Sequence, residues 1–132
     1  MMRVLQISLF LVLLGGAANY SMAAPGSWVA SAPAVRVAVA GRIYQSQALQ
    51  SPQPELLKGQ RTRSVRWSYR VPAGRVVHAW LCQQQQCMPV AESGQTDSLG
   101  DPTMPWYFRF QLPDNERRAV IVEQLQLIVN YQ

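Results

Sequence analysis

An all-β fold is the class that this sequence predicts, either an antiparallel β-sandwich or a small barrel of about six to eight short strands with one hairpin disulfide. Three observations lead to it. Apolar and polar side chains alternate with a period of two in several short runs, turns with proline and glycine separate those runs, and helical periodicity is almost absent. Such alternation is typical of strands that bury one face and expose the other.

The N-terminal segment has the pattern of a secretory signal peptide. Arg3 is followed by an apolar run over 4–14 and then by small residues that lead to Ala23. A charged start, a short apolar core and a small-residue cleavage site define such peptides, and this run is too short for a stable membrane anchor. We therefore expect 1–23 to be a secretory signal peptide and 24–132 to form a single β-sandwich domain, although cleavage after Ala24 fits nearly as well.

The composition of the chain indicates its cellular compartment and the class of partner that it binds. The sequence has 12 Lys and Arg against 7 Asp and Glu, a net charge of +5, and Lys58 is its one lysine. A signal peptide with no later apolar span predicts a product of the periplasm of a Gram-negative bacterium, which is an oxidising compartment. Nucleic acid is not an expected partner there, so the arginines suit acidic protein surfaces or anionic lipid.

The predicted strands are short and carry β-branched and aromatic residues. In 62–71 (TRSVRWSYRV) these residues fall on one face and arginines and serines on the other. The run 106–112 (WYFRFQL) repeats the signature and points its aromatic residues at 106, 108 and 110 inward. The complete set of predicted strands is 35–39, 42–44, 62–71, 106–112, 119–123 and 125–131, with the cysteine hairpin described below.

Three segments lack a strand pattern. A short helical turn is expected at 54–58, because Pro54 suits the start of a helix and Gly59 its end. The stretches 45–60 and 91–105 are rich in polar residues, glycine and proline, and both are expected to be long surface connections.

Pro72-Ala73-Gly74 is expected to form a three-residue hairpin loop, since glycine supplies the positive φ that such a loop needs. In that register Trp67 faces Ala79, whereas a two-residue loop would place it opposite Trp80. The first register sends four polar or aromatic side chains to the outer side of one hairpin. We predict that this face binds a partner, and its residues are Arg66, Arg70, His78 and Trp80.

Cys82 and Cys87 are the two cysteines of the chain, and four glutamines at 83–86 separate them. This spacing places them opposite each other at the mouth of a hairpin, within reach of a disulfide, and pairs Leu81 with Met88. A metal site would need more ligands, and a redox site usually has the tighter C-x-x-C spacing. We expect a disulfide that stabilises the hairpin by about 2 kcal/mol, on a third strand that Pro89 marks as a sheet edge.

A family resemblance is carried by WSYRVPAGRVVHAWLCQQQQC, by PWYFRFQL and by the terminal IVNYQ, together with GSW after the signal segment. The chain resembles the FlhE family of small periplasmic proteins that are encoded with the flagellar export genes of enteric and related bacteria. The resemblance covers nearly the whole mature chain, and L-C-x4-C and I-V-N-Y are its most specific parts.

The resemblance implies a non-enzymatic role at or near the flagellar type III export apparatus. There the family is associated with limiting proton leak through the export channel, or with chaperone-like binding during assembly. The implied partners are flagellar export or basal-body proteins. The resemblance implies no cofactor, no metal and no catalytic residue, and Cys82 and Cys87 carry over as a structural pair.

Two alternatives come from the residues themselves. A periplasmic carbohydrate- or peptidoglycan-binding module would use exposed aromatic side chains, for which Trp28, Trp80 and Tyr107 are candidates. A strand-donating chaperone would use the edge at 88–90, although Pro89 blunts that edge. A hydrolase is disfavoured, because the sequence has no G-x-S-x-G motif and its one histidine lies in no recognisable triad.

Overall fold

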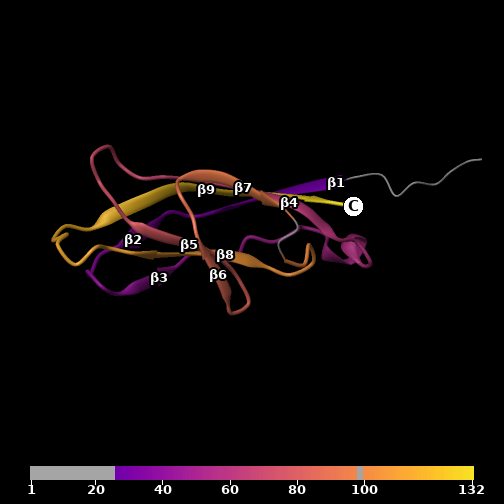
Figure 1. Cartoon of the computed structure of the whole chain (residues 1–132), viewed down its shortest axis with the longest axis horizontal. Coiled ribbons are helices and arrows are strands. Elements are labelled where there is room, and N and C mark those ends of the chain that lie inside the picture. Colours follow the sequence, from indigo (N-terminus) through magenta and orange to yellow (C-terminus); the bar gives the residue numbers. More distant parts are fainter. Residues whose placement is uncertain (1–25, 98–99) are drawn as a thin grey trace, which may run out of the picture.

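The structure, a computed structural model, describes residues 26–97 and 100–132, so the predicted signal peptide at 1–23 lies outside the described residues. Two antiparallel sheets pack face to face in one sandwich (Figure 1). The described elements are β1 (Gly26–Ala32), β2 (Val35–Val37), β3 (Ile43–Gln45), η1 (Pro54–Leu57), β4 (Thr62–Arg70), β5 (His78–Gln83), β6 (Gln86–Pro89), β7 (Ser93–Asp97), β8 (Trp106–Gln111) and β9 (Val120–Tyr131).

The first sheet has the order β1-β9-β4-β7, with β2 also paired to β9, and the second has the order β3-β8-β5-β6. The predicted all-β sandwich with a hairpin disulfide is therefore confirmed, with one strand more than the predicted upper number. The predicted edge position of β6 is also confirmed, because β6 ends the second sheet and pairs with β5 alone.

The core lies between the two sheets and is dominated by alternate residues of β8. Trp106, Phe108 and Phe110 are at most 1% exposed, as their spacing predicts. Tyr69 reaches them from the other sheet, with its ring centroid 5.7 Å from that of Phe108 and 5.4 Å from that of Phe110. Both contacts are edge-to-face, which is a favourable geometry for aromatic rings and joins the two sheets at this point.

β9 is one strand of 12 residues, whereas the sequence suggested two separate runs at 119–123 and 125–131. The two runs differ in phase, since Val122 and Leu125 are both buried although they are three positions apart. Gln124 lies between them with φ 55°, and β4 pairs Ser68 with Gln126 but Arg70 with Glu123. An extra residue is thus accommodated in a β-bulge, which returns the apolar side chains to the inner face.

Two strands of the first sheet carry little sequence signal. β1 pairs along its length with the end of β9, from Gly26 opposite Tyr131 to Ala32 opposite Leu125. β7 lies inside the stretch 91–105, which was predicted to be a connection, and it pairs with β4. Its residues are small and polar because they lie at the edge of the sheet, so hydrophobic alternation does not reveal the strand.

The predicted hairpin between 65–71 and 75–81 is wrong. A turn does form, with the amide of Arg75 donating to the carbonyl of Pro72 at 3.1 Å and Gly74 at φ 77°. However, β4 pairs with β7 and β9, and β5 pairs with β6 and β8, so 71–77 is a connection between the two sheets. Periodicity identified the inner face of each strand correctly but cannot identify the neighbouring strand.

The stretch 45–60 is more firmly held than a surface connection. The predicted helical turn is present as the 3-10 turn η1, which buries Leu57. Leu49 is fully buried and exchanges backbone hydrogen bonds with Trp106. Ser46 is also buried, and its hydroxyl accepts from the amide of Phe108 at 2.9 Å. These contacts hold the connection against β8.

Candidate functional site

The outer face of the second sheet carries a group of side chains that suits binding rather than folding. On β5 and β8 the residues that point inward are buried, and the residues between them point to the outside. Four of these outward residues, which we call the aromatic–arginine face, are His78, Trp80, Tyr107 and Arg109. His78 is exposed and the other three are partly buried.

Strand register brings these four side chains together. Trp80 lies directly opposite Arg109, so Tyr107 is its diagonal neighbour across the strand pair. The ring centroids of His78 and Trp80 are 6.3 Å apart. The guanidinium carbon of Arg109 lies 5.3 Å from the centroid of the Tyr107 ring, which is within cation–π range.

Further contacts hold Arg109 and Tyr107 in place. The Nε of Arg109 donates to Oε1 of Gln45 at 3.4 Å, and its Nη1 lies 3.7 Å from the sulfur of Cys87. The hydroxyl of Tyr107 donates to the carbonyl of Gln84 at the tip of the cysteine hairpin. The face is therefore supported by β3 on one side and by the cysteine hairpin on the other.

The hairpin itself forms as predicted. Cys82 and Cys87 face each other and are joined by a disulfide, and Leu81 faces Met88. The loop is shorter than the four residues expected, because Gln83 and Gln86 also pair and leave a two-residue turn. Gln84 begins this turn with φ 55°, whereas Gln85 does not have a positive φ. Positive φ at the first central residue alone is the pattern of the II′ turns of two-residue hairpins.

The structure separates the four residues that were predicted to share one hairpin face. His78 and Trp80 lie on the outer face of the second sheet, whereas Arg66 and Arg70 lie on β4 of the first sheet. Arg66 donates to Oε1 of Gln95 at 3.1 Å on that sheet. Since both strands bury their other face in the same core, the two pairs lie on opposite outer faces of the sandwich.

Three of the four tryptophans are buried. Trp28, which was a candidate for glycan stacking, is 6% exposed and donates from Nε1 to the carbonyl of Pro102 at 3.2 Å. Trp67 and Trp106 also belong to the core, at 8% and 1% exposed. Of the three aromatic candidates for a glycan site, Trp80 and Tyr107 therefore remain.

In the described part of the chain, one titratable group is strongly perturbed, and it lies outside this face. Burial, with a smaller contribution from the carboxylate of Glu92, raises the pKa of Tyr69 to about 12. Its hydroxyl donates to the carbonyl of Val90 at 3.2 Å. Within 26–97 and 100–132, no three side chains of His, Cys, Asp or Glu lie close enough together to hold a metal ion.

Comparison with known proteins decides the family. The family model of the flagellar protein FlhE matches residues 34–132, which is most of the chain. The chain belongs to the FlhE family. A solved crystal structure of FlhE has 28% sequence identity and a TM-score of 0.68, and the match covers 83% of this chain and 99% of that chain. Among curated proteins, none matches this chain.

Membership of the FlhE family agrees with the resemblance carried by the cysteine hairpin and the C-terminal strand. In the part of the chain that the structure describes, no helix is long and apolar enough to cross a membrane. Sequence reasoning missed Arg109 as a member of the aromatic–arginine face because its partners on β5 and β3 are distant in the sequence. Alternation in WYFRFQL did place Tyr107 and Arg109 on the same outer face, which was the available signal.

Proposed function

We propose that this FlhE-family chain is a non-enzymatic periplasmic protein that binds a flagellar export or basal-body protein through its aromatic–arginine face. In this role it acts at the flagellar type III export apparatus and limits proton leak through the export channel, by occupying a component of that channel or by chaperoning one during assembly. The observation that carries the proposal is the grouping of Trp80, Tyr107 and Arg109 on one outer face.

Their chemistry supports a protein partner. Tryptophan, tyrosine and arginine are the residues that most often dominate the binding energy of protein interfaces. Here they are held by cross-strand contacts before any partner arrives, which lowers the entropic cost of ordering them on binding. Ile43, which is 48% exposed, begins the neighbouring strand β3 and extends the apolar part of this surface.

Residues 1–23 are proposed to deliver the chain to the periplasm and to be cleaved there, leaving 24–132 as the folded domain. The disulfide supports this placement because such bonds persist in oxidising compartments. The intact mass of the chain purified from a periplasmic extract tests the cleavage position. A mass that includes the first 23 residues would contradict it.

The test of function starts from a deletion of the gene in its own bacterium. Cytoplasmic pH is followed with a pH-sensitive fluorescent protein while flagellar export is induced, and swimming is scored in parallel. The deletion is expected to acidify the cytoplasm, and a second deletion that removes the export apparatus is expected to abolish this acidification. Normal pH and motility in the first deletion would overturn the proposal.

Complementation then locates the binding face. The wild-type gene is compared with Trp80→Ala/Arg109→Ala and with the matched pair Arg66→Ala/Arg70→Ala from the opposite outer face. We expect the first variant to fail and the second to restore cytoplasmic pH, with both accumulating and unfolding like the wild type. If the Arg66→Ala/Arg70→Ala variant alone fails, the partner site lies on β4, which agrees with the sequence-based prediction for Arg66 and Arg70.

A carbohydrate- or peptidoglycan-binding role is the second candidate, because Trp80 and Tyr107 lie on one face and could stack on sugar rings. Sedimentation with purified peptidoglycan distinguishes the two functions. The glycan role would be favoured by two results together. The purified protein would bind peptidoglycan and lose this binding on Trp80→Ala, and deletion of the gene would leave cytoplasmic pH unchanged.

A further inference from the structure

Three connections meet at one end of the long axis of the sandwich (Figure 1). They are 38–42 between β2 and β3, 71–77 between β4 and β5, and 112–119 between β8 and β9, and we call them the loop end. The amide of Gly41 donates to the carbonyl of Leu112 at 3.2 Å, and Gln111 donates from Nε2 to the carbonyl of Gly41 at 2.7 Å. These bonds join the first connection to the third.

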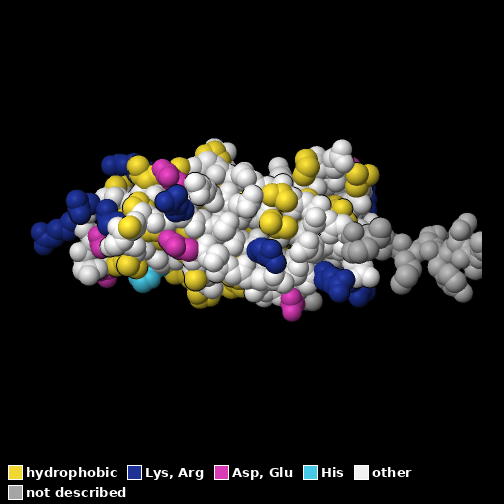
Figure 2. Space-filling model, turned by 90° about the horizontal axis from the view of Figure 1, so that it is seen from above, with side chains coloured by type: hydrophobic (Ala, Val, Ile, Leu, Met, Phe, Trp, Pro, Cys, Tyr) yellow, Lys and Arg dark blue, Asp and Glu magenta, His cyan; other side chains and the backbone are white. Residues whose placement is uncertain are grey.

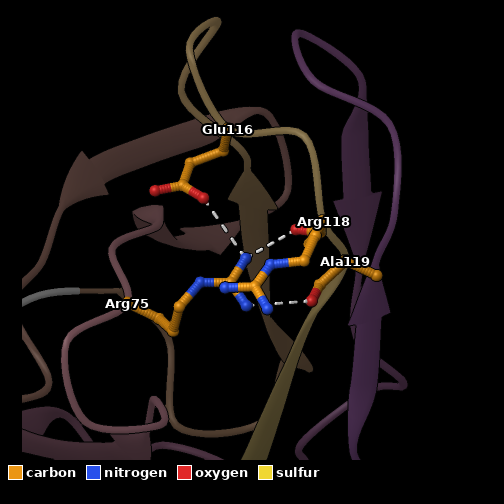
Figure 3. Close-up of polar contacts among 4 residues, drawn as sticks. All are labelled: Arg75, Glu116, Arg118 and Ala119. Atoms are coloured by element: carbon orange, nitrogen blue, oxygen red, sulfur yellow. Dashed lines mark hydrogen bonds and ion pairs between the residues drawn. The ribbon is translucent and has the colours of Figure 1, made fainter.

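Arg75 joins the second connection to the third (Figure 3). Its guanidinium donates to the carbonyls of Arg118 at 2.6 Å and Ala119 at 3.3 Å, and it pairs with the carboxylate of Glu116 at 3.3 Å. The three connections are therefore cross-linked to one another, so the side chains at their tips are displayed in a fixed arrangement.

Exposed large apolar side chains gather at the loop end and at the start of the strands that follow it. Six such side chains are at least 46% exposed in the described part of the chain, and four of them lie in these connections or within the first two residues of the strands that follow. Val39 and Val76 lie in the connections and are 53% and 58% exposed, while Ile43 is the first residue of β3 and Ile121 the second residue of β9. Their exposure has no role in folding, because each of these side chains points away from the core.

Arginines surround these apolar side chains. The three connections contain four arginines and two acids, of which Arg75 and Glu116 pair with each other. The other three arginines, Arg42, Arg117 and Arg118, are exposed. Figure 2 shows basic side chains, which here are arginines, gathered at this end of the molecule with hydrophobic and some Asp and Glu side chains beside them.

We propose that the loop end docks on an anionic lipid surface. Aliphatic side chains on separate protruding loops suit the boundary between lipid headgroups and acyl chains, where each enters independently, and arginine forms paired hydrogen bonds with phosphate. A protein partner would instead favour large aromatic anchors, which the loop end lacks. Each arginine near an anionic membrane strengthens binding by about fivefold, so the proposal predicts binding that falls as salt rises.

The test uses the chain as the cell processes it, purified from the periplasm after expression of the full gene. Sedimentation with vesicles of phosphatidylcholine is compared with vesicles that contain phosphatidylglycerol as well. We expect salt-sensitive binding to the anionic vesicles alone. Val39→Ser/Val76→Ser should weaken this binding about tenfold, and Arg117→Glu/Arg118→Glu by about thirtyfold or more.

Matched variants at the opposite end serve as controls. Leu56→Ser removes the most exposed of the six large apolar side chains named above, at 70%, and Lys58→Glu/Arg61→Glu makes the same change of charge. Both controls should keep the wild-type affinity, and thermal unfolding should be equal for all variants. The proposal is overturned if the wild type does not bind anionic vesicles, or if controls and loop-end variants lose binding alike. It is also overturned if the loop-end changes alter only self-association or capture of an acidic protein.

Discussion

Gly94 shows how the absence of one side chain determines the packing of a sheet edge. A Cβ atom at this position of β7 would lie 2.4 Å from Cζ2 of Trp67 and 2.9 Å from its Cε2. The Trp67 indole also donates from Nε1 to the carbonyl of Ala91 at 3.0 Å, so the ring has little freedom to move away. Glycine therefore lets β7 approach β4 closely enough to pair with it.

Replacement of Gly94 by alanine is expected to lower the free energy of unfolding by about 1–3 kcal/mol, because the added methyl group forces Trp67 or β7 to shift. Urea denaturation followed by tryptophan fluorescence measures the change. Ser93→Ala, at an exposed position of the same strand, is the control and should have little effect. Equal stability of the Gly94→Ala and Ser93→Ala proteins would contradict this account of the edge.

Tyr69 gives the protein a stability that depends on pH in the alkaline range. Its pKa is raised from 10.0 to about 12, so the folded state disfavours the ionised phenolate relative to the unfolded state. The stabilisation is complete below pH 10 and is lost as the pH rises from 10 through 12. Stability should therefore fall more steeply over this range for the wild type than for Tyr69→Phe, which cannot ionise.

The comparison is made by urea denaturation of both proteins at pH 8 and at about pH 11. At pH 8 the phenylalanine variant should be less stable by about 1 kcal/mol, since it loses the hydrogen bond to Val90. The gap should narrow or reverse at the higher pH. A gap that stays constant would show that ionisation of Tyr69 is not coupled to folding.

At the scale of the element, β9 depends on its bulge to bury both of its halves. Gln124 holds a left-handed backbone conformation that costs most residues energy and costs glycine little. We predict that Gln124→Gly raises the free energy of unfolding by up to about 1 kcal/mol, and that Gln124→Val lowers it by about the same amount. Urea denaturation measures both.

Gln126, two positions further along the same strand, provides the contrast. It is exposed and lies in regular pairing with Ser68 and Ser31, so Gln126→Gly should lower stability by about 0.5–1 kcal/mol. Glycine would thus act in opposite directions at 124 and 126. If glycine changed the free energy of unfolding in the same direction at both positions, relief of backbone strain at Gln124 would be ruled out as the cause of the effect.

The elements also show where sequence reasoning succeeds and where it stops. Strands that bury large side chains, such as β4 and β8, are visible from alternation alone, and the cysteine hairpin is visible from its loop length. β7 was not predicted as a strand, because its edge position and its contact with Trp67 favour small polar residues that show no hydrophobic alternation. The β4–β5 hairpin was wrong because a turn with a positive-φ glycine fits a connection between sheets as well as a hairpin.

The candidate site was half predicted for the same reason. Outward direction of His78 and Trp80 follows from their alternation with Ala79 and Leu81, and does not depend on the neighbouring strand. The residues beside them do depend on which strand is the neighbour. In the predicted hairpin with β4, Arg66 would lie opposite Trp80, whereas in the structure β8 is the neighbour and Arg109 lies opposite Trp80. Register between strands far apart in the sequence is a property of the assembled core, which a local pattern does not contain.

At the scale of the whole molecule, the two proposed surfaces are adjacent and have different roles, since the loop end is proposed to bind lipid and the aromatic–arginine face to bind a protein. His78 directly follows the connection 71–77 and lies opposite Gln111, which bonds to Gly41 of the loop end. The aromatic–arginine face therefore begins where the loop end stops and runs along the side of the sandwich. A chain that rests on lipid by its loop end would present this face sideways, toward a protein that stands in the same membrane.

This arrangement predicts that the two surfaces fail in different ways. Docking on lipid raises the local concentration of the chain near its partner but adds no contact with it, so higher expression can replace it. In the deletion strain, Val39→Ser/Val76→Ser should restore cytoplasmic pH only when overproduced. Trp80→Ala/Arg109→Ala should fail at every expression level, although it binds anionic vesicles within about twofold of the wild type because the sites are separate.

Expression from a titratable promoter, with the periplasmic amount measured for each strain, gives both curves of pH against protein. A loop-end variant that overproduction cannot rescue would mean that these apolar tips contact the partner themselves. Rescue of the Trp80→Ala/Arg109→Ala variant at high expression would mean that its face contributes affinity without being essential. If the loop end binds lipid and the aromatic–arginine face binds the partner, the pH curve of the Val39→Ser/Val76→Ser variant shifts to higher protein amounts. The curve of the Trp80→Ala/Arg109→Ala variant then stays flat.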